Sequence, residues 1–509
     1  MRRAAPPTRA ASTAPGQWLW SLVAGAVFAS ASLVTAYVAQ MPVRWNPPYE
    51  SNTVTAATLF GGVLLTGSWL WWLLVARHRR ADGLRGAATG VLVAVFSYPI
   101  VLLLAEFFQT DWHFHPAGSS LTDRLVHVVM LAGFELLTTG FAATAVLALV
   151  GLGLGSVEAR LSAGAAYATG RRRSLREIAV LSLGIGATSI IALLVVTFVS
   201  LSLLPIRPLA APSRSPAPNS YEEALNAFAL IKEHEANLPL HPRCGSVLLT
   251  HGEKVARTVV FLHGLTNCPA QADELAPWLF AMGYNVLVPR LPGHGEADAL
   301  TLALADVTAE DFVSTARSSL DLAQALGDEV IVVGLSAGGT ATAHQAQHEN
   351  RLSNAILVAP FLATGIVPQW AAQAATNLLL LAPNMMVWWD PRSPYTSAEM
   401  DYAYPRFATH ALAQLMRLGH IVAVEADTDM QAAQRIGFLL NEADLAVDNR
   451  LAQSVAAAWR QHGGEVIVSM LPQTKGLPHD LIDPRQPDAA VDLIYPMLVE
   501  MMSPERAER

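Results

Sequence analysis

The stretch VVGLSAGGTA, residues 332–341, places a serine at the centre of a glycine-rich turn. The short apolar run before it, EVIVV at 329–333, predicts a strand, and the segment HQAQHENR after it predicts a helix. Strand, sharp turn and helix form the context in which Gly-x-Ser-x-Gly exposes a nucleophilic serine. Glycines stand at 334 and 338, and we expect that side chains at these two positions would collide with neighbouring backbone. Ser336 is therefore the candidate nucleophile.

The chain around this turn divides into two regions of opposite charge. Its 509 residues are too many for one compact domain, and 52% hydrophobic against 15% charged residues favours a membrane protein. Residues 1–219 hold 16 Arg and 8 acidic residues, whereas residues 220–509 hold 17 Lys and Arg against 33 acidic residues. The acidic second region argues against a nucleic-acid partner.

Five apolar runs in the first region each approach or exceed the roughly 20 residues that cross a bilayer. They predict a transmembrane region over 1–204, with spans at 18–39, 54–76, 87–108, 128–153 and 179–204. Arginines crowd the N-terminus and the second and fourth loops, while the first and third loops hold one each, Arg44 and Arg124. This asymmetry predicts a multi-pass protein of the cytoplasmic membrane whose second region lies outside the cytoplasm. Cleavage of the first run as a signal peptide would leave that orientation unchanged.

The second region predicts an α/β domain. Residues 205–220 hold five prolines and no apolar periodicity, which indicates a semi-extended linker. From 221 to 502, short β-type runs alternate with helical stretches, the pattern of a mostly parallel sheet with helices on both faces. We expect a frayed tail at 503–509 and strands at 246–250, 258–262, 285–289, 329–334, 354–359, 436–440 and 465–470.

Three motifs in this order carry a resemblance to a known family: FLHGLTNCP at 261–269, PRLPGHG at 289–295 and GLSAGG at 334–339. Over about residues 240–500 the chain resembles the α/β-hydrolase family, in particular its carboxylesterase and monoacylglycerol-lipase-like members. The resemblance implies a serine, an acid and a histidine in that chain order. It also implies that the insertion at about 361–435 forms a cap over the site.

The acid and the base are expected after the last two strands. The resemblance selects Asp444 over Glu442 and Asp448 because a valine follows it at the family's spacing, and Asp448 suits the N-cap of the next helix. His479 follows the final strand and is the expected base, which Asp444 would orient. Four other histidines are less well placed, namely His294, His410, His420 and His462.

Backbone N–H groups complete the expected site. The N–H of Ala337 would stabilise the oxyanion at the start of the helix, and by resemblance the N–H of Leu265 would do so as well. The two cysteines of the chain, Cys244 and Cys268, both fall in the second region. An oxidising compartment would favour a disulfide between them. The alternative is two separate buried thiols that act as small apolar residues. A bridge would hold the loop that carries Leu265.

The sequence predicts neither a cofactor nor a metal. His113 and His115 lack an evident third ligand. The first interpretation is a membrane-tethered serine hydrolase that cleaves small-molecule or lipid carboxylic esters. An acyltransferase that uses the same acyl-enzyme, and a non-catalytic sensor or transport protein, are the alternatives.

Overall fold

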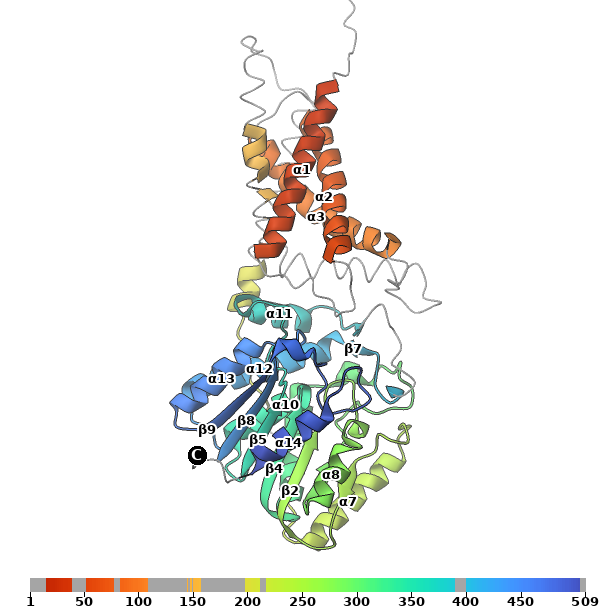
Figure 1. Cartoon of the computed structure of the whole chain (residues 1–509), viewed down its shortest axis with the longest axis vertical. Coiled ribbons are helices and arrows are strands. Elements are labelled where there is room, and N and C mark those ends of the chain that lie inside the picture. The colour runs from red at the N-terminus through yellow and green to blue at the C-terminus, as the bar shows by residue number, and fades with distance from the viewer. Residues whose placement is uncertain are drawn as a thin grey trace, which may run out of the picture. The chain divides into compact units, whose positions relative to one another are not determined.

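The computed structural model describes residues 15–38, 52–76, 83–108, 144, 147–148, 150–156, 197–210, 217–389 and 400–503 (Figure 1). The chain divides into two compact units, residues 1–199 and residues 200–509. The division falls five residues before the predicted end of the transmembrane region at 204.

Unit 1 is helical where the first three apolar runs predict helices. Its long helices are α1 (Pro15–Val38), α2 (Asn52–Leu74) and α3 (Gly83–Phe108). α1 packs on α2, and α2 packs on α3. Glycines allow close approach: a Cβ on Gly25 would lie 2.7 Å from the Leu64 carbonyl oxygen, and one on Gly86 only 1.8 Å from that of Gly151.

Within the described ranges, no helix is both long enough and apolar enough to cross a membrane. The predicted spans at 128–153 and 179–204 lie mostly outside those ranges.

Unit 2 is built on a seven-stranded sheet with the order β1-β3-β2-β4-β5-β8-β9. β1 pairs antiparallel with β3, and the other pairs are parallel. All seven predicted strands are confirmed, with ends that differ by three residues or fewer. The strands are β1 (Val247–Leu249), β2 (Val255–Leu262), β3 (Asn285–Val288), β4 (Gly327–Leu335), β5 (Asn354–Val358), β8 (Arg435–Asn441) and β9 (Glu465–Leu471).

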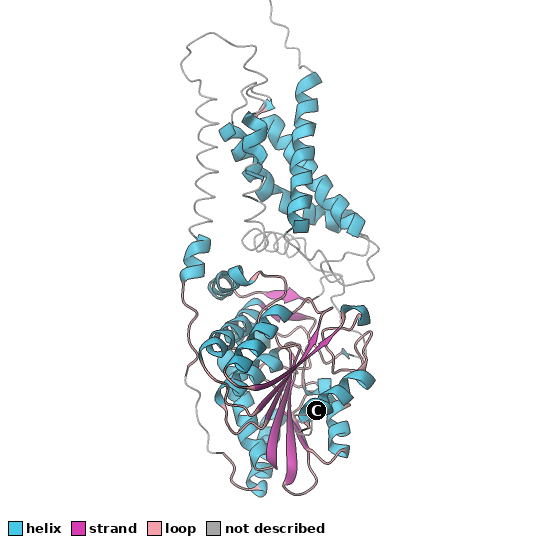
Figure 2. Cartoon of the chain, turned by 60° about the vertical axis from the view of Figure 1, so that its left-hand side comes forward, coloured by secondary structure: helices cyan, strands magenta, loops and turns pink. Residues whose placement is uncertain are grey.

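Helices cover both faces of this sheet (Figure 2). α8 (Leu275–Ala281) and α14 (Val491–Met502) share a buried apolar cluster with the strands on one face. α9 (Ala309–Gln324) and α10 (Ala337–His348) pack against β2 and β4, and α7 (Tyr221–Ala236) packs along α9. The other elements are α13 (Asn449–Gln461) and the short 3₁₀ helices η2 (Pro269–Ala272), η3 (Ala303–Asp306) and η5 (Gln473–Lys475).

The predicted cap insertion at about 361–435 consists of two parts that pack differently. Its first part contains α11 (Gln369–Leu381) and an antiparallel pair, β6 (Met386–Trp388) and β7 (Arg406–Ala408). Its last helix, α12 (Thr409–Thr428), packs on α11 and also on α10 and α13, so it joins the first part to the body of the domain. Gly419 lets α12 approach the segment after β5 closely, because a Cβ there would lie 2.0 Å from the Leu362 carbonyl oxygen.

The first part of the predicted linker is bound to the body of unit 2. The Arg417 guanidinium of α12 donates to the carbonyl oxygens of Arg207 (2.8 Å) and Pro208 (2.7 Å). The Ala210 N–H donates to Glu310 of α9, which is itself paired with Arg417 at 2.7 Å. We call residues 207–210 the strap, and linker residues 211–216 lie outside the described ranges.

Candidate active site

Ser336 lies between the carboxyl end of β4 and the first residue of α10. Its backbone has φ 53° and ψ −110°, a strained conformation for a residue with a side chain. The expected glycine collisions are confirmed: a Cβ on Gly334 would lie 2.2 Å from the Gly338 carbonyl oxygen, and one on Gly338 would lie 2.0 Å from that of Leu262. The turn therefore presents Ser336 at the strand end, where parallel sheets place their sites.

Asp444 and His479 meet at the same edge of the sheet, after β8 and β9 respectively. The Nδ1 of His479 lies 2.5 Å from an oxygen of Asp444. The other two candidate carboxylates have different partners. Asp448 caps α13 as expected, by accepting from the N–H groups of the first turn, and Glu442 accepts from the Gln473 N–H at 3.0 Å.

The charge of Asp444 acts on the imidazole. Burial disfavours the protonated ring, but the attraction and hydrogen bond of Asp444 outweigh burial, so the pKa of His479 is raised from its ordinary value of 6.5. The carboxylate side chain is 1% exposed and that of His479 is 32% exposed. Bonding at Nδ1 leaves Nε2 as the ring atom for proton exchange with a hydroxyl.

The loop after β2 carries Leu265 beside Ser336. A Cβ on Gly264 would lie 3.7 Å from the Ser336 Cβ, so the backbone of this loop approaches the serine closely. The cap holds the loop from the other side: the Tyr404 N–H donates to the Thr266 carbonyl oxygen, and the Trp389 indole donates to the Thr266 hydroxyl, both at 2.7 Å. We call residues 263–268 the oxyanion loop, after the role that the resemblance predicts for the Leu265 N–H.

Four of the other histidines that the structure describes have structural surroundings. His263 is fully buried and accepts from the Leu291 N–H at 3.1 Å, and burial places its pKa well below 6.5. Burial likewise lowers the pKa of His294 to about 4. His410 and His462 bond to backbone carbonyl oxygens. Both His263 and His294 are therefore neutral near pH 7.

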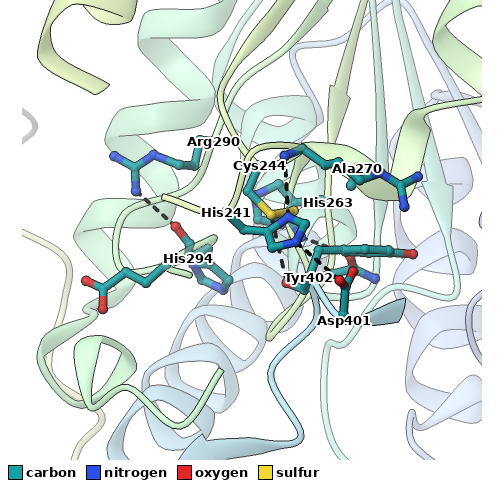
Figure 3. The surroundings of a disulfide bond; sticks show 12 residues. His241, Cys244, His263, Ala270, Arg290, His294, Asp401 and Tyr402 are labelled. Atoms are coloured by element: carbon teal, nitrogen blue, oxygen red, sulfur yellow. Dashed lines mark hydrogen bonds and ion pairs between the residues drawn. A yellow bond between two sulfur atoms is a disulfide. The ribbon is translucent and has the colours of Figure 1, made fainter. Parts of the chain in front are cut away.

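Cys244 and Cys268 form a disulfide with an S–S distance of 2.03 Å. Both are fully buried, in a small cluster with Tyr402 and Ala403 of the cap. Figure 3 shows the disulfide at Cys244, with Tyr402 of the cap beside it. Cys268 ends the oxyanion loop, so the bridge fastens that loop to the segment before β1.

Sequence reasoning missed a pair of buried polar residues behind the site. Gln271 of η2 and Asp480, the residue after His479, are joined by a hydrogen bond of 2.7 Å. They lie 209 residues apart in the chain, and neither belongs to one of the three motifs. Only the folded arrangement identifies them.

The part of the chain that the structure describes contains no cluster of three His, Cys, Asp or Glu side chains placed to hold a metal ion. His113 and His115 lie outside that part.

Comparison with known proteins assigns the fold of unit 2. Residues 259–492 match the model of the alpha/beta hydrolase family, so the chain carries an α/β-hydrolase domain. It is 28% identical over 160 residues to a thermostable monoacylglycerol lipase of Bacillus sp., covering 31% of this chain and 60% of the relative. It is 32% identical over 113 residues to a pyrethroid hydrolase of Sphingobium wenxiniae, and this match covers 22% of this chain and 39% of the relative. Both matches thus span less than two thirds of the relative. Both relatives are hydrolases, and the family is consistent with a carboxylic ester hydrolase.

Among solved structures, a soluble variant of monoglyceride lipase from Saccharomyces cerevisiae aligns with 50% of this chain and 90% of its own, at 14% identity and a TM-score of 0.41. One structure from work on LipS and LipT, two metagenome-derived lipolytic enzymes, aligns with 52% of this chain and 99% of its own, at 18% identity and a TM-score of 0.39.

Proposed function

We propose that this protein is a membrane-tethered serine hydrolase that cleaves carboxylic esters, including lipid esters, through an acyl-enzyme. The observation that carries the proposal is the 2.5 Å contact between His479 and Asp444, at the sheet edge where the strained Ser336 turn also lies. An acid–histidine pair at the strand ends and a serine in a nucleophile elbow are the parts of one catalytic unit.

In the proposed reaction the Ser336 hydroxyl attacks the ester carbonyl carbon while His479 Nε2 takes its proton. Asp444 stabilises the imidazolium through Nδ1. The N–H groups of Leu265 and Ala337 donate to the oxyanion of the tetrahedral intermediate. Collapse of this intermediate expels the alcohol, which takes the proton from His479. Water, activated by the same histidine, then hydrolyses the acyl-enzyme and restores Ser336.

The test is labelling with a fluorophosphonate, followed by turnover of p-nitrophenyl esters of increasing chain length. We expect one labelled residue, Ser336, identified by peptide mass spectrometry. Assays with an added alcohol acceptor separate hydrolysis from acyl transfer, because a transferase forms the new ester in preference to the free acid. Absence of both labelling and turnover in the folded protein would refute the proposal.

The membrane part of the proposal has separate support. The sequence holds five apolar runs with alternating arginine content, and unit 1 exposes large apolar side chains such as Leu65 and Trp69. The Cys244–Cys268 bridge suits an oxidising compartment outside the cytoplasm. A phosphatase reporter fused after residue 505 should be active and a fluorescent protein there dark. A bright, phosphatase-negative fusion would reverse the proposed orientation.

A further inference from the structure

The buried side chain of Gln271 joins two loops of the site. It is 2% exposed and lies in η2, just after the oxyanion loop. Its Oε1 accepts from the Gly264 N–H at 2.9 Å, and its Nε2 donates to Oδ2 of Asp480 at 2.7 Å. One amide therefore bonds both the residue before Leu265 and the residue after His479.

Asp480 fixes the loop that carries His479. Its Oδ1 accepts from the N–H groups of Ile482 (3.0 Å) and Asp483 (3.2 Å), which closes the turn after the histidine. Its Oδ2 also accepts from the Gln486 amide at 3.2 Å. Because the carboxylate is 7% exposed, it depends on these donors rather than on water.

We propose that Gln271 is a positioning residue of the ester hydrolase, whose amide holds the oxyanion loop and the His479 loop at the separation that catalysis requires. The inference rests on the proposed function and deepens it. A glutamine suits the position because it offers one acceptor to Gly264 and one donor to Asp480. The direct contact between the loops, Asn267 to Asp480, is longer at 3.4 Å and leaves Gln271 as the main link.

The first experiment compares Gln271→Met with Gln347→Met in the full-length protein. Gln347 is a matched control because it is a buried glutamine whose amide also bridges two partners, the Asp429 carbonyl oxygen at 3.2 Å and the Trp459 indole at 2.5 Å. We expect Gln271→Met to lower kcat and the fluorophosphonate labelling rate by about 10- to 100-fold with KM nearly unchanged. Gln347→Met should leave kcat and labelling unchanged.

The second experiment exchanges donor and acceptor. In Gln271→Glu two carboxylates would face each other, so kcat should fall as in Gln271→Met. In the double variant Gln271→Glu with Asp480→Asn, the new carboxylate accepts from both the Gly264 N–H and the new amide, and the bridge is restored once the Gln486 amide turns its oxygen toward that new amide. We expect kcat per folded molecule to recover by about tenfold over Gln271→Glu, which a recovery of stability alone would not produce.

The outcomes separate this inference from the proposed function. Normal kcat in Gln271→Met, or a double variant no better than Gln271→Glu, overturns the positioning role while the wild-type protein still turns over esters. A wild-type protein that neither labels at Ser336 nor cleaves esters overturns both.

Discussion

Among the described residues of unit 1, the buried polar side chains are serines and threonines, such as Ser21 and Thr66. In unit 2, polar side chains lie inside, and Gln271, Asp480 and Asp444 gather with His479 at one edge of the sheet. Burying ionisable and amide groups costs free energy unless they are paired. The comparison therefore places the side chains suited to chemistry in unit 2, and variants with effects of different size can test this.

The largest expected effect is that of Ser336→Ala. Loss of the nucleophile should lower ester turnover by about 10⁴-fold or more and abolish fluorophosphonate labelling. Ser319→Ala, at a buried serine of α9, is the matched control and should keep full turnover. If Ser336→Ala retained wild-type turnover, the chemistry would lie elsewhere than at this edge.

Asp444→Asn should lower kcat by about 10³- to 10⁴-fold. The imidazolium would lose the carboxylate that stabilises it, and His479 would no longer be held in the tautomer that carries its proton on Nδ1. Glu442→Gln serves as the control, since Glu442 bonds to the Gln473 N–H and is exposed. Steady-state rates on a soluble ester decide between the two carboxylates. A severe loss in Glu442→Gln beside a mild one in Asp444→Asn would show that the wrong acid is proposed.

Removal of the disulfide should destabilise unit 2. The bridge spans a sequence separation of 24 residues, and closing such a loop is worth about 3 kcal/mol by chain entropy. The double variant Cys244→Ser, Cys268→Ser should therefore unfold at lower urea concentration than the oxidised wild type. Reduction of the wild type is the control. If neither treatment shifts the urea midpoint, the bridge does not form in solution.

A smaller loss in the free energy of unfolding is expected from Arg417→Met, which removes the side chain that binds the strap. Arg417 is nearly fully buried and donates to two strap carbonyl oxygens and to Glu310, so its removal should cost about 1–3 kcal/mol. Lys254→Met breaks the exposed pair with Asp328 and should cost well under about 1 kcal/mol. Urea unfolding of both variants measures the difference, and equal losses would mean that the strap is not held in solution.

The smallest expected change is in the pH dependence of kcat/KM. Asp444 raises the pKa of His479, so the acid limb of the wild-type profile should lie above pH 6.5. The same shift means that protonated His479 stabilises the fold at low pH and that this contribution is lost as pH rises through the raised pKa. In Asp444→Asn the burial of the ring remains while its main charge partner is gone, although Asp480 still faces it. The acid limb of the kcat/KM profile of this variant should therefore move to lower pH. An acid limb at the wild-type pH would indicate that a group other than His479 titrates.

The strands and the nucleophile turn were predictable because local chemistry determines them. Runs rich in Val, Ile and Leu define β2, β4 and β5 to within three residues. The collision at Gly334 is with Gly338 of the same turn, whereas the collision at Gly338 is with Leu262 of β2. The pairing of Asp444 with His479 was predicted from the resemblance to the α/β-hydrolase family, and the parallel strands β8 and β9 bring the two residues to one edge of the sheet.

Features that depend on distant contacts were not predictable. The apolar pattern of α12 fits a cap as well as a body helix, and its close packing at Gly419 depends on Leu362 of another segment. The strap is held by Arg417, about two hundred residues further along the chain. The Gln271–Asp480 bond has the same origin, since no local pattern marks either residue.

The disulfide also has a consequence for the order in which the protein is made. Cys244 and Cys268 are both synthesised before Ser336, Asp444 and His479. The ring that they close contains β1 and β2 but not the strands that carry the three catalytic candidates. Oxidation of a nascent chain can thus secure the oxyanion loop while the nucleophile is still to be translated, so that the later strands dock onto a loop whose end is already tied.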